Sequence, residues 1–408
     1  MAQNAPPEAA SSATLDLMIE LARQAAALRD WLFDRALPIW WEIGADRVHG
    51  GFHEAIGLDG RPVSKAHRAR TIARQVFSYC EAGRLGWKGP WREAALHALE
   101  FFRAHFIARD DTIVSVVDLD GRCFDSRFEL YNQAFALLAY ASAHRTFGPE
   151  AGWCRPAIAL RVALEQRFAH PLGGFLEGLE ARLPQCANPH MHLFEAAIAW
   201  SALDDDPGWA RMADGLAQLC LDKMIEPASG ALREFFDKDW AAVAGIAGSV
   251  CEPGHHYEWA VLLDRWAKRA GRKQPDEVAR IIAFADAHGV NARGFVMNAV
   301  RTDGSIHDPV ARLWAQAERI RAYLVQGRSG EQLSTAIAAL DRFLATPTAG
   351  LWFDQLDEKD VFVIEPARAT SLYHIIGVAA DLLGASVVPD PMHDAMQPRR
   401  SDSILMER

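Results

Sequence analysis

The chain repeats itself at intervals of about sixty residues, and this period limits the fold more than any other feature. Each copy holds a short extended stretch that opens on glycine or closes on an Asp-Gly turn, and the starts lie 65, 58, 57, 64 and 56 residues apart. The copies are GGFHEAIGLDG from Gly50, SVVDLDG from Ser115, GGFLEGLE from Gly173, GALREFFDKD from Gly230, GFVMNAVRTDG from Gly294 and GLWFDQLDEKD from Gly350. Such a period indicates a repeat architecture.

Each copy predicts one hairpin and two helices. Apolar residues alternate along the stretches and close on turn formers such as Asp59-Gly60, Asp120-Gly121 and Asp303-Gly304, which is typical of short β-hairpins. Between the hairpins, apolar residues recur at helical spacing, as in FELYNQAFALLAYASAHRTF. Six hairpin-linked helix pairs predict an all-α (α/α)6 barrel with the hairpins at one mouth. An open helical solenoid is the alternative, and it would need polar capping repeats at its ends.

The body is expected to be a single catalytic domain over 14–388. The segments 1–13 and 389–408 lack periodicity and are typical of flexible tails.

The 43 Lys and Arg against 53 Asp and Glu give a net charge of −10, which disfavours a nucleic-acid partner. No apolar run approaches the ~20 residues of a membrane span, and the start lacks a secretory signal, so we expect a cytoplasmic protein with no membrane partner. The six cysteines contain no CxxC pair and are expected to be reduced.

One helix of each pair follows its hairpin directly, and polar side chains recur at the starts of these helices. We expect the inner helices at 64–84, 127–145, 189–204, 254–270, 309–326 and 369–382. The recurring residues, 59 to 63 apart, are Arg70, Tyr131, His192, His255, Trp314 and His374, with Arg74 one turn after Arg70. Equivalent positions around a ring meet at one mouth, where helix N-termini add positive dipole character. This mouth is the candidate active site.

The segment EPGHHYEWAVLL places an acid beside an imidazole. His255, Glu258 and Trp259 stand at i, i+3 and i+4 and share a helix face. The adjacent His256 points about 100° away around the helix, so we expect only His255 to face the mouth.

Two further pairs place a carboxylate and a ring on one helix face: His192 with Glu195 at i, i+3, and Trp314 with Glu318 at i, i+4. A structural interpretation stands beside the functional one, because a lone histidine is commonly a satisfied core residue and a helical carboxylate commonly forms a surface ion pair. Asn188, four residues before His192, fits an N-cap as well as a substrate ligand.

The motifs that carry these residues resemble those of the N-acylglucosamine 2-epimerase family, which includes mannose isomerases and cellobiose 2-epimerases. They are RTIARQVF, LYNQAF, NPHMHLFEA, EPGHHYEWAVLL, RLWAQAERI and SLYHI, spread over about residues 30–380. The resemblance implies an (α/α)6 barrel, in agreement with the repeat count. It also implies that His255 and His374 are the acid/base pair at C1 and C2 of the sugar. The substrate-binding residues that it implies are Arg74, Tyr131, Asn188, His192, Glu258, Trp314 and Glu318.

The sequence departs from the family pattern at two places. Many members carry tryptophan where this chain has Arg70, which fits either a solvated helix end or a second arginine that accepts a phosphate or another anion. The segment AVAGIAGSVCE lacks an arginine that some isomerases have there. Both departures bear on the identity of the substrate.

We expect a sugar isomerase that interconverts D-mannose and D-fructose through a cis-enediolate. Histidine, with an ordinary pKa of about 6.5, exchanges protons near neutrality, and Arg74 would stabilise the enediolate. A monosaccharide is the expected partner, and a homodimer is left open. The chain contains no GxGxxG, GxxxxGK[ST], HExxH or GxSxG motif and no metal-ligand spacing, so we expect no cofactor and no metal.

Several alternatives remain at this stage. Proton return to the opposite face of C2 would make the chain a sugar 2-epimerase of the N-acylglucosamine/N-acylmannosamine or glucose/mannose type. Anion binding at Arg70 would favour a phosphosugar isomerase. A glycoside hydrolase would use two carboxylic acids about 5–10 Å apart, such as Glu258 and Glu318, but would leave the histidines without a role. A non-catalytic sugar-binding protein would need only aromatic residues at the mouth.

Overall fold

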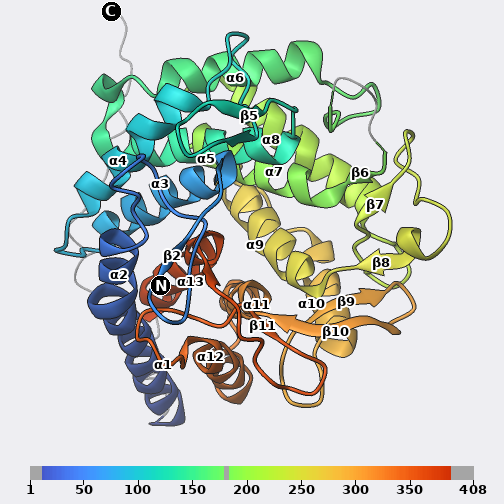
Figure 1. Ribbon diagram of the computed structural model, residues 1–408. Helices are drawn as coiled ribbons and strands as arrows, with labels where there is room; N and C mark the ends of the chain where they lie inside the picture. The colour runs from blue at the N-terminus through green and yellow to red at the C-terminus, as the bar shows by residue number, and fades with distance from the viewer. Residues whose placement is uncertain (1–11, 179–182, 387–408) are drawn as a thin grey trace, which may run out of the picture.

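The computed structural model describes residues 12–178 and 183–386, and it is a ring of six helix pairs (Figure 1). The inner helices are α3 (Ala69–Arg84), α5 (Leu130–Phe147), α7 (Ala187–Ser201), α9 (Pro253–Arg269), α11 (Leu313–Val325) and α13 (Leu372–Ser386). The outer helices are α4 (Trp91–His105), α6 (Cys154–Arg167), α8 (Pro207–Leu219), α10 (Asp276–His288) and α12 (Glu331–Leu344). The sixth outer element comprises α1 (Ser12–Trp31), the π-helical turn η1 (Leu32–Ala36) and α2 (Leu37–Glu42).

Burial separates the inner helices from the outer ones. Every residue from 132 to 143 of α5 is buried, as expected of a helix surrounded by others. The outer helix α12 buries only the face that carries Leu333, Ile337 and Leu340. Outer and inner helices also share large aromatic contacts: the ring of Trp200 on α7 stacks on Trp209 of α8 with centroids 5.2 Å apart.

The strands form four small antiparallel sheets at the ends of the inner helices, in the orders β12-β1-β2, β3-β4-β5, β6-β7 and β8-β9-β10-β11. Their bounds are β1 (Ala55–Ile56), β2 (Pro62–Val63), β3 (His67–Arg68), β4 (Val116–Val117), β5 (Cys123–Asp125), β6 (Gln185–Cys186), β7 (Phe235–Phe236), β8 (Val250–Cys251), β9 (Met297–Arg301), β10 (Ile306–Arg312), β11 (Gln355–Leu356) and β12 (Ala367–Arg368). The turns predicted at 59–60, 120–121 and 303–304 join β1 to β2, β4 to β5 and β9 to β10. The copy from Gly173 forms a bridge between Ala169 and Phe175.

The two ends of the chain meet and close the ring. Strand β1 pairs with β12, with Ala55 opposite Arg368. Helix α13 packs against α3, and the Gln75 side chain on α3 donates from Nε2 to the carbonyl of Ala369, at 2.9 Å. The barrel is therefore closed, and the open solenoid is excluded.

Polar side chains early in four inner helices hold the hairpins in place. Each lies four residues after the helix N-cap and bonds to the backbone N–H of one hairpin residue at 2.8–3.0 Å. The pairs are Gln133 with Ile113, His190 with Phe175, His256 with Leu232 and Gln316 with Val296. The hairpins are thus fixed over the helix starts, and His256 serves this structural purpose.

Element boundaries differ from the predicted ones by a few residues. Helices α3 and α11 begin at residues 69 and 313, later than predicted, because β3 and β10 continue directly to the helix starts. Helix α1 begins at Ser12, two residues before the predicted domain start, while 1–11 and 389–408 lie outside the described residues. Within the part of the chain that the structure describes, no helix is long and apolar enough to cross a membrane.

Candidate active site

The six inner helices begin around a common opening. The residue before each helix, or before the 3-10 turn η5 (Ala369–Ser371) that leads into α13, has extended backbone because a strand or hairpin segment precedes it. These residues are Arg68, Glu129, Cys186, Glu252, Arg312 and Arg368. The opening therefore combines charged side chains with the positive ends of the inner helices.

A cavity of about 220 Å³ lies between these helix starts. Its lining consists of Arg74, Tyr131, Asn188, His192, Glu252, His255, Glu258, Arg312, Trp314, Thr370, Ser371 and His374. Eight of the ten predicted site residues are among them. The equivalence of repeat positions thus brings together side chains that are 300 residues apart in sequence.

The indole of Trp314 lies against both predicted catalytic histidines. Its ring centroid is 5.1 Å from that of His255 and 5.7 Å from that of His374. Gly254 permits this approach, because a Cβ there would stand 2.5 Å from the indole ring. The glycine of the PGH motif is therefore explained by the close packing of Trp314.

His255 is surrounded by carboxylates. Its Nδ1 lies 3.0 Å from a Glu234 oxygen and 3.6 Å from a Glu252 oxygen, and Glu258 is one helical turn away. Burial lowers the pKa of His255, but the charges of Glu234 and Glu252 outweigh it and raise the pKa to about 10. His255 is therefore an imidazolium at neutral pH.

At His374 the effects of burial and positive charge on the pKa outweigh that of the neighbouring carboxylate, the reverse of His255. Its Nδ1 lies 2.7 Å from Oε1 of Glu318. Burial lowers the pKa of His374, the bond to Glu318 offsets only part of this, and the charges of Arg74 and Arg321 lower it further. A neutral His374 that donates from Nδ1 to the Glu318 carboxylate keeps a free lone pair on Nε2.

Five buried polar atoms of the cavity lining have no partner in hydrogen-bond geometry: Arg74 Nε, Asn188 Oδ1, His255 Nδ1, Glu258 Oε1 and Arg312 Nε. His255 Nδ1 still lies 3.0 Å from a Glu234 oxygen. Buried polar groups are normally paired, so this concentration marks a place built for a polar ligand. Arg74 is held in position by a 2.7 Å bond from Nη2 to the Tyr131 hydroxyl, with its guanidinium 4.0 Å over the Phe135 ring.

His192 is the third imidazole that lines the cavity. Burial lowers the pKa of His192 to about 4, despite its 3.4 Å contact with Glu195. Glu195 also accepts a bond from the Tyr373 hydroxyl at 2.5 Å. Burial, together with the charges of Glu318 and Glu195, raises the pKa of Glu258 well above its ordinary value, which favours the protonated carboxylic acid.

The other two predicted residues lie outside this cavity. Glu318 is fully buried behind His374 and does not line it. Arg70 lies in a neighbouring cavity of about 610 Å³, where its Nη1 is 3.1 Å from Oε2 of Glu129. The N-cap of α7 is Cys186, so Asn188 is not the cap and instead lines both cavities.

Sequence reasoning missed Glu252, Arg312, Thr370 and Ser371 in the lining and Glu234 beside His255. The first two stand next to recognised motifs, one residue before PGH and two before Trp314, so the repeat register could have found them. Glu234 lies just before β7, on a hairpin that gives no chemical signal in sequence.

Three groups of described residues bring metal-donor types within 4.8 Å of one another. They are His192 with Glu195 and Glu258, Glu234 with Glu252 and His255, and Glu258 with Glu318 and His374. Most of these donors contact one another as imidazole–carboxylate pairs, so we do not treat them as metal ligands.

Comparison with known proteins identifies relatives over most of the chain. The family model described as N-acylglucosamine 2-epimerase (GlcNAc 2-epimerase) matches residues 50–378. A protein of Rhizobium meliloti (strain 1021) named mannose-6-phosphate isomerase is 42% identical over 373 residues, which cover 88% of this chain and 96% of the relative. A D-mannose isomerase of Thermobifida fusca is 31% identical over 245 residues, 53% of this chain and 58% of that one.

The fold is also found in solved structures. The crystal structure of a sugar epimerase from a ruminal bacterium superimposes with a TM-score of 0.80 at 19% identity. The matched region covers 89% of this chain and 99% of the epimerase chain. At this identity the likeness concerns the fold, and it agrees with the six-pair barrel.

Proposed function

The chain belongs to the N-acylglucosamine 2-epimerase family of sugar isomerases and epimerases, and from this premise we propose that it interconverts D-mannose and D-fructose. The observation that carries the proposal is the pair of imidazoles that face one cavity in opposite charge states. His374 is suited to accept a proton and His255 to donate one. Aldose–ketose isomerisation needs both at adjacent carbons.

In the proposed reaction the open-chain aldose lies between the two histidines. Nε2 of His374 takes the C2 proton, the C2–H electron pair forms the C1=C2 bond, and the aldehyde π pair moves to O1. Arg74 and the imidazolium of His255 stabilise the resulting enediolate. C1 then receives a proton from His255 while the O2 hydroxyl proton passes to O1, which leaves the carbonyl at C2. His374 releases the C2 proton to solvent and His255 takes a proton from solvent, which restores both histidines and brings a solvent-derived proton to C1 in the next turnover. Proton delivery to the opposite face of C2 would give the epimer instead.

The charge around the opening favours a neutral sugar over a phosphorylated one. The neighbouring cavity is lined by four glutamates, Glu129, Glu177, Glu234 and Glu252, and its Arg70 is paired with Glu129. A phosphate dianion there would meet like charges. The name of the Rhizobium relative favours the alternative, a mannose-6-phosphate isomerase. The assay therefore includes mannose 6-phosphate as a substrate.

The deciding assay is proton NMR in D₂O with D-mannose, mannose 6-phosphate, glucose and N-acetylmannosamine as separate substrates. We expect fructose from mannose, with deuterium at C1, and slower turnover of mannose 6-phosphate. Faster turnover of the phosphate ester would replace this substrate assignment. Deuterium at C2 of an inverted aldose would make the chain an epimerase, and no exchange in any sample would contradict the proposal.

Replacement of either catalytic histidine tests the two-histidine mechanism. We expect His255→Ala and His374→Gln each to lower kcat about a thousandfold, because each removes one proton transfer. His307→Gln, at an exposed position of β10, is the matched control and should keep wild-type kcat. Near-normal kcat in either variant of the pair would refute the mechanism.

We also propose a cytoplasmic location, since all six cysteines are unpaired in the structure, five of them at least partly buried. A homodimer stays a prediction, to be checked by analytical ultracentrifugation.

A further inference from the structure

Behind the imidazole of His374 runs a row of three charged side chains of alternating sign: Glu318, Arg321 and Asp381. Glu318 Oε1 lies 2.7 Å from His374 Nδ1. Arg321 Nη1 reaches both Glu318 oxygens, at 3.0 and 2.8 Å, and its Nε donates to Asp381 Oδ2 at 2.8 Å. His374 and Asp381 lie on α13 and enclose Glu318 and Arg321, which lie on α11, so the packing of these two helices assembles the row.

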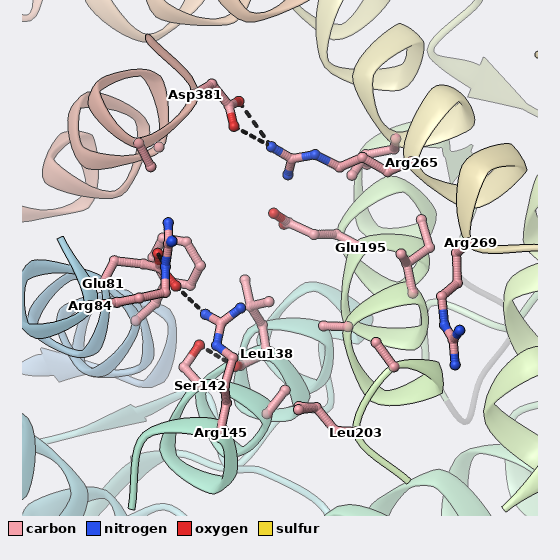
Figure 2. Close-up of a pocket in the computed structure, with 18 of the residues that line it drawn as sticks. Glu81, Arg84, Leu138, Ser142, Arg145, Glu195, Leu203, Arg265, Arg269 and Asp381 are labelled. Carbon is pink, nitrogen blue, oxygen red and sulfur yellow. Dashed lines mark hydrogen bonds and ion pairs between the residues drawn. The ribbon is translucent and has the colours of Figure 1, made fainter. Parts of the chain in front are cut away.

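The row crosses from one cavity to another. His374 lines the reaction cavity, whereas Arg321 and Asp381 line a cavity of about 310 Å³ at the opposite end of the inner helices. Figure 2 shows that cavity, with Asp381 joined to Arg265 on one side and Glu81, Arg84 and Arg145 grouped on another. Glu318 is completely buried between the two cavities, and the Arg321 side chain is only 5% exposed.

Such a buried ion pair contributes little net stability, because removing both charges from water costs about as much free energy as their attraction returns. A role in catalysis explains the row better. Without Arg321, Glu318 would face His374 as its sole ionic partner and would draw a proton onto the imidazole. With Arg321 present, both Glu318 oxygens accept from its guanidinium, so the negative charge of Glu318 is balanced by Arg321 and attracts a proton to His374 less strongly.

We propose that Arg321 is a positioning residue that binds both oxygens of Glu318 and thereby keeps His374 neutral, with its proton on Nδ1 and its lone pair on Nε2. The inference rests on the proposed function, in which His374 takes the C2 proton. Asp381 completes the row by orienting Arg321.

The other groups that face His374 leave this assignment in place. Arg74 on α3 adds positive charge, which favours the neutral ring. His192 on α7 is itself neutral at pH 7, given its pKa of about 4. Burial and the charges of Glu318 and Glu195 raise the pKa of Glu258 on α9, which favours its uncharged form. Glu318 is therefore the main anion beside His374, and Arg321 determines how strongly the Glu318 charge favours protonation of the His374 ring.

The test combines kinetics with a measurement that needs no turnover. Arg321→Met removes the charge and keeps the side-chain length. Arg321→Lys keeps the charge but has one nitrogen, so it cannot bind Glu318 and Asp381 through separate nitrogens as Nη1 and Nε of Arg321 do. The matched control is Arg84→Met, because Arg84 lines the same cavity but pairs with Glu81. Each variant is checked for native far-UV circular dichroism.

For Arg321→Met we expect the acid limb of the kcat/KM profile to move up by about one pH unit, with about a tenfold loss below the limb and recovery above it. Arg321→Lys should show a smaller shift, and Arg84→Met none. If Arg321→Met does not fold, the lysine variant carries the kinetic test. An unmoved limb in a folded Arg321 variant would overturn the proposal.

Nitrogen-15 NMR of the histidine rings, with His374 assigned by its loss in His374→Gln, reads the tautomer directly. We expect a proton on Nδ1 and none on Nε2 at neutral pH in the wild type, and ring protonation at a higher pH in Arg321→Met. A wild-type ring protonated on Nε2 would contradict the positioning role. If wild type turns over no sugar while the ring states are as expected, the function fails and the positioning inference stands.

Discussion

At the scale of single residues, the chemistry depends on what surrounds two identical side chains. His255 faces the carboxylates of Glu234 and Glu252, while His374 faces one carboxylate whose charge Arg321 shares. The same imidazole therefore has a pKa of about 10 at one place and a lowered pKa at the other. The acid and base roles that we propose for the two histidines follow from neighbours that differ in number and charge.

These pKa shifts predict the pH window of activity. The base must be neutral, so kcat/KM should fall as pH drops through the lowered pKa of His374, below about 6.5. The acid must be charged, so activity should fall as pH rises through about 10. Glu234→Gln removes an anion that raises the pKa of His255, and the alkaline limb should then move to lower pH by about one unit or more.

The pH–rate profiles of wild type and Glu234→Gln provide the measurement. Glu226→Gln, on a carboxylate paired with Arg233 away from the cavity, is the control and should leave both limbs in place. If the alkaline limb does not move in Glu234→Gln, a group other than the His255–Glu234 pair determines the pH at which activity is lost.

At the scale of elements, the hairpins depend on side chains that replace missing backbone partners. Gln133 on α5 accepts from the N–H of Ile113 and donates to its carbonyl, at 2.8 and 2.9 Å, and all three groups are buried. The repeat uses glutamine or histidine at this position in four inner helices. A short strand is thus held in place by the helix that follows it.

Gln133→Leu should lower the free energy of unfolding by about 2–4 kcal/mol, because both buried backbone groups of Ile113 lose their partner. Gln218→Leu, on the exposed face of α8, should change it by less than about 0.5 kcal/mol. Urea unfolding gives both values, and equal stability of the two variants would contradict this account of the hairpins.

At the scale of the whole molecule, closure makes the first and last repeats neighbours. The β1–β12 pairing and the α3–α13 packing leave no free end in the ring. A closed ring differs from an open repeat array, in which end units can fray independently.

We therefore expect one cooperative unfolding transition. Far-UV circular dichroism and tryptophan fluorescence should follow the same curve in urea, because loss of any pair uncovers the apolar faces of its neighbours. A separate early transition, seen by one probe only, would show that part of the ring unfolds on its own.

Sequence alone determined the architecture, because it follows from local and periodic rules, and the repeat together with the family motifs predicted eight of the residues that line the cavity. Helical spacing separates His255 from His256 by about 100°. The sixty-residue period that starts at Arg70 places Tyr131, His192 and His374 at helix starts around the cavity, whereas Arg70 itself lies outside it and Arg74, one turn later, lines it.

Only the tertiary structure decided which charges meet. Glu318 binds His374 from another helix, 56 residues away, and Arg70 pairs with Glu129, 59 residues away. Glu234 reaches His255 from a hairpin. Periodicity places a residue on a face, but the ion pair that it forms depends on how neighbouring helices pack, and that pairing sets the protonation states on which the proposed reaction depends.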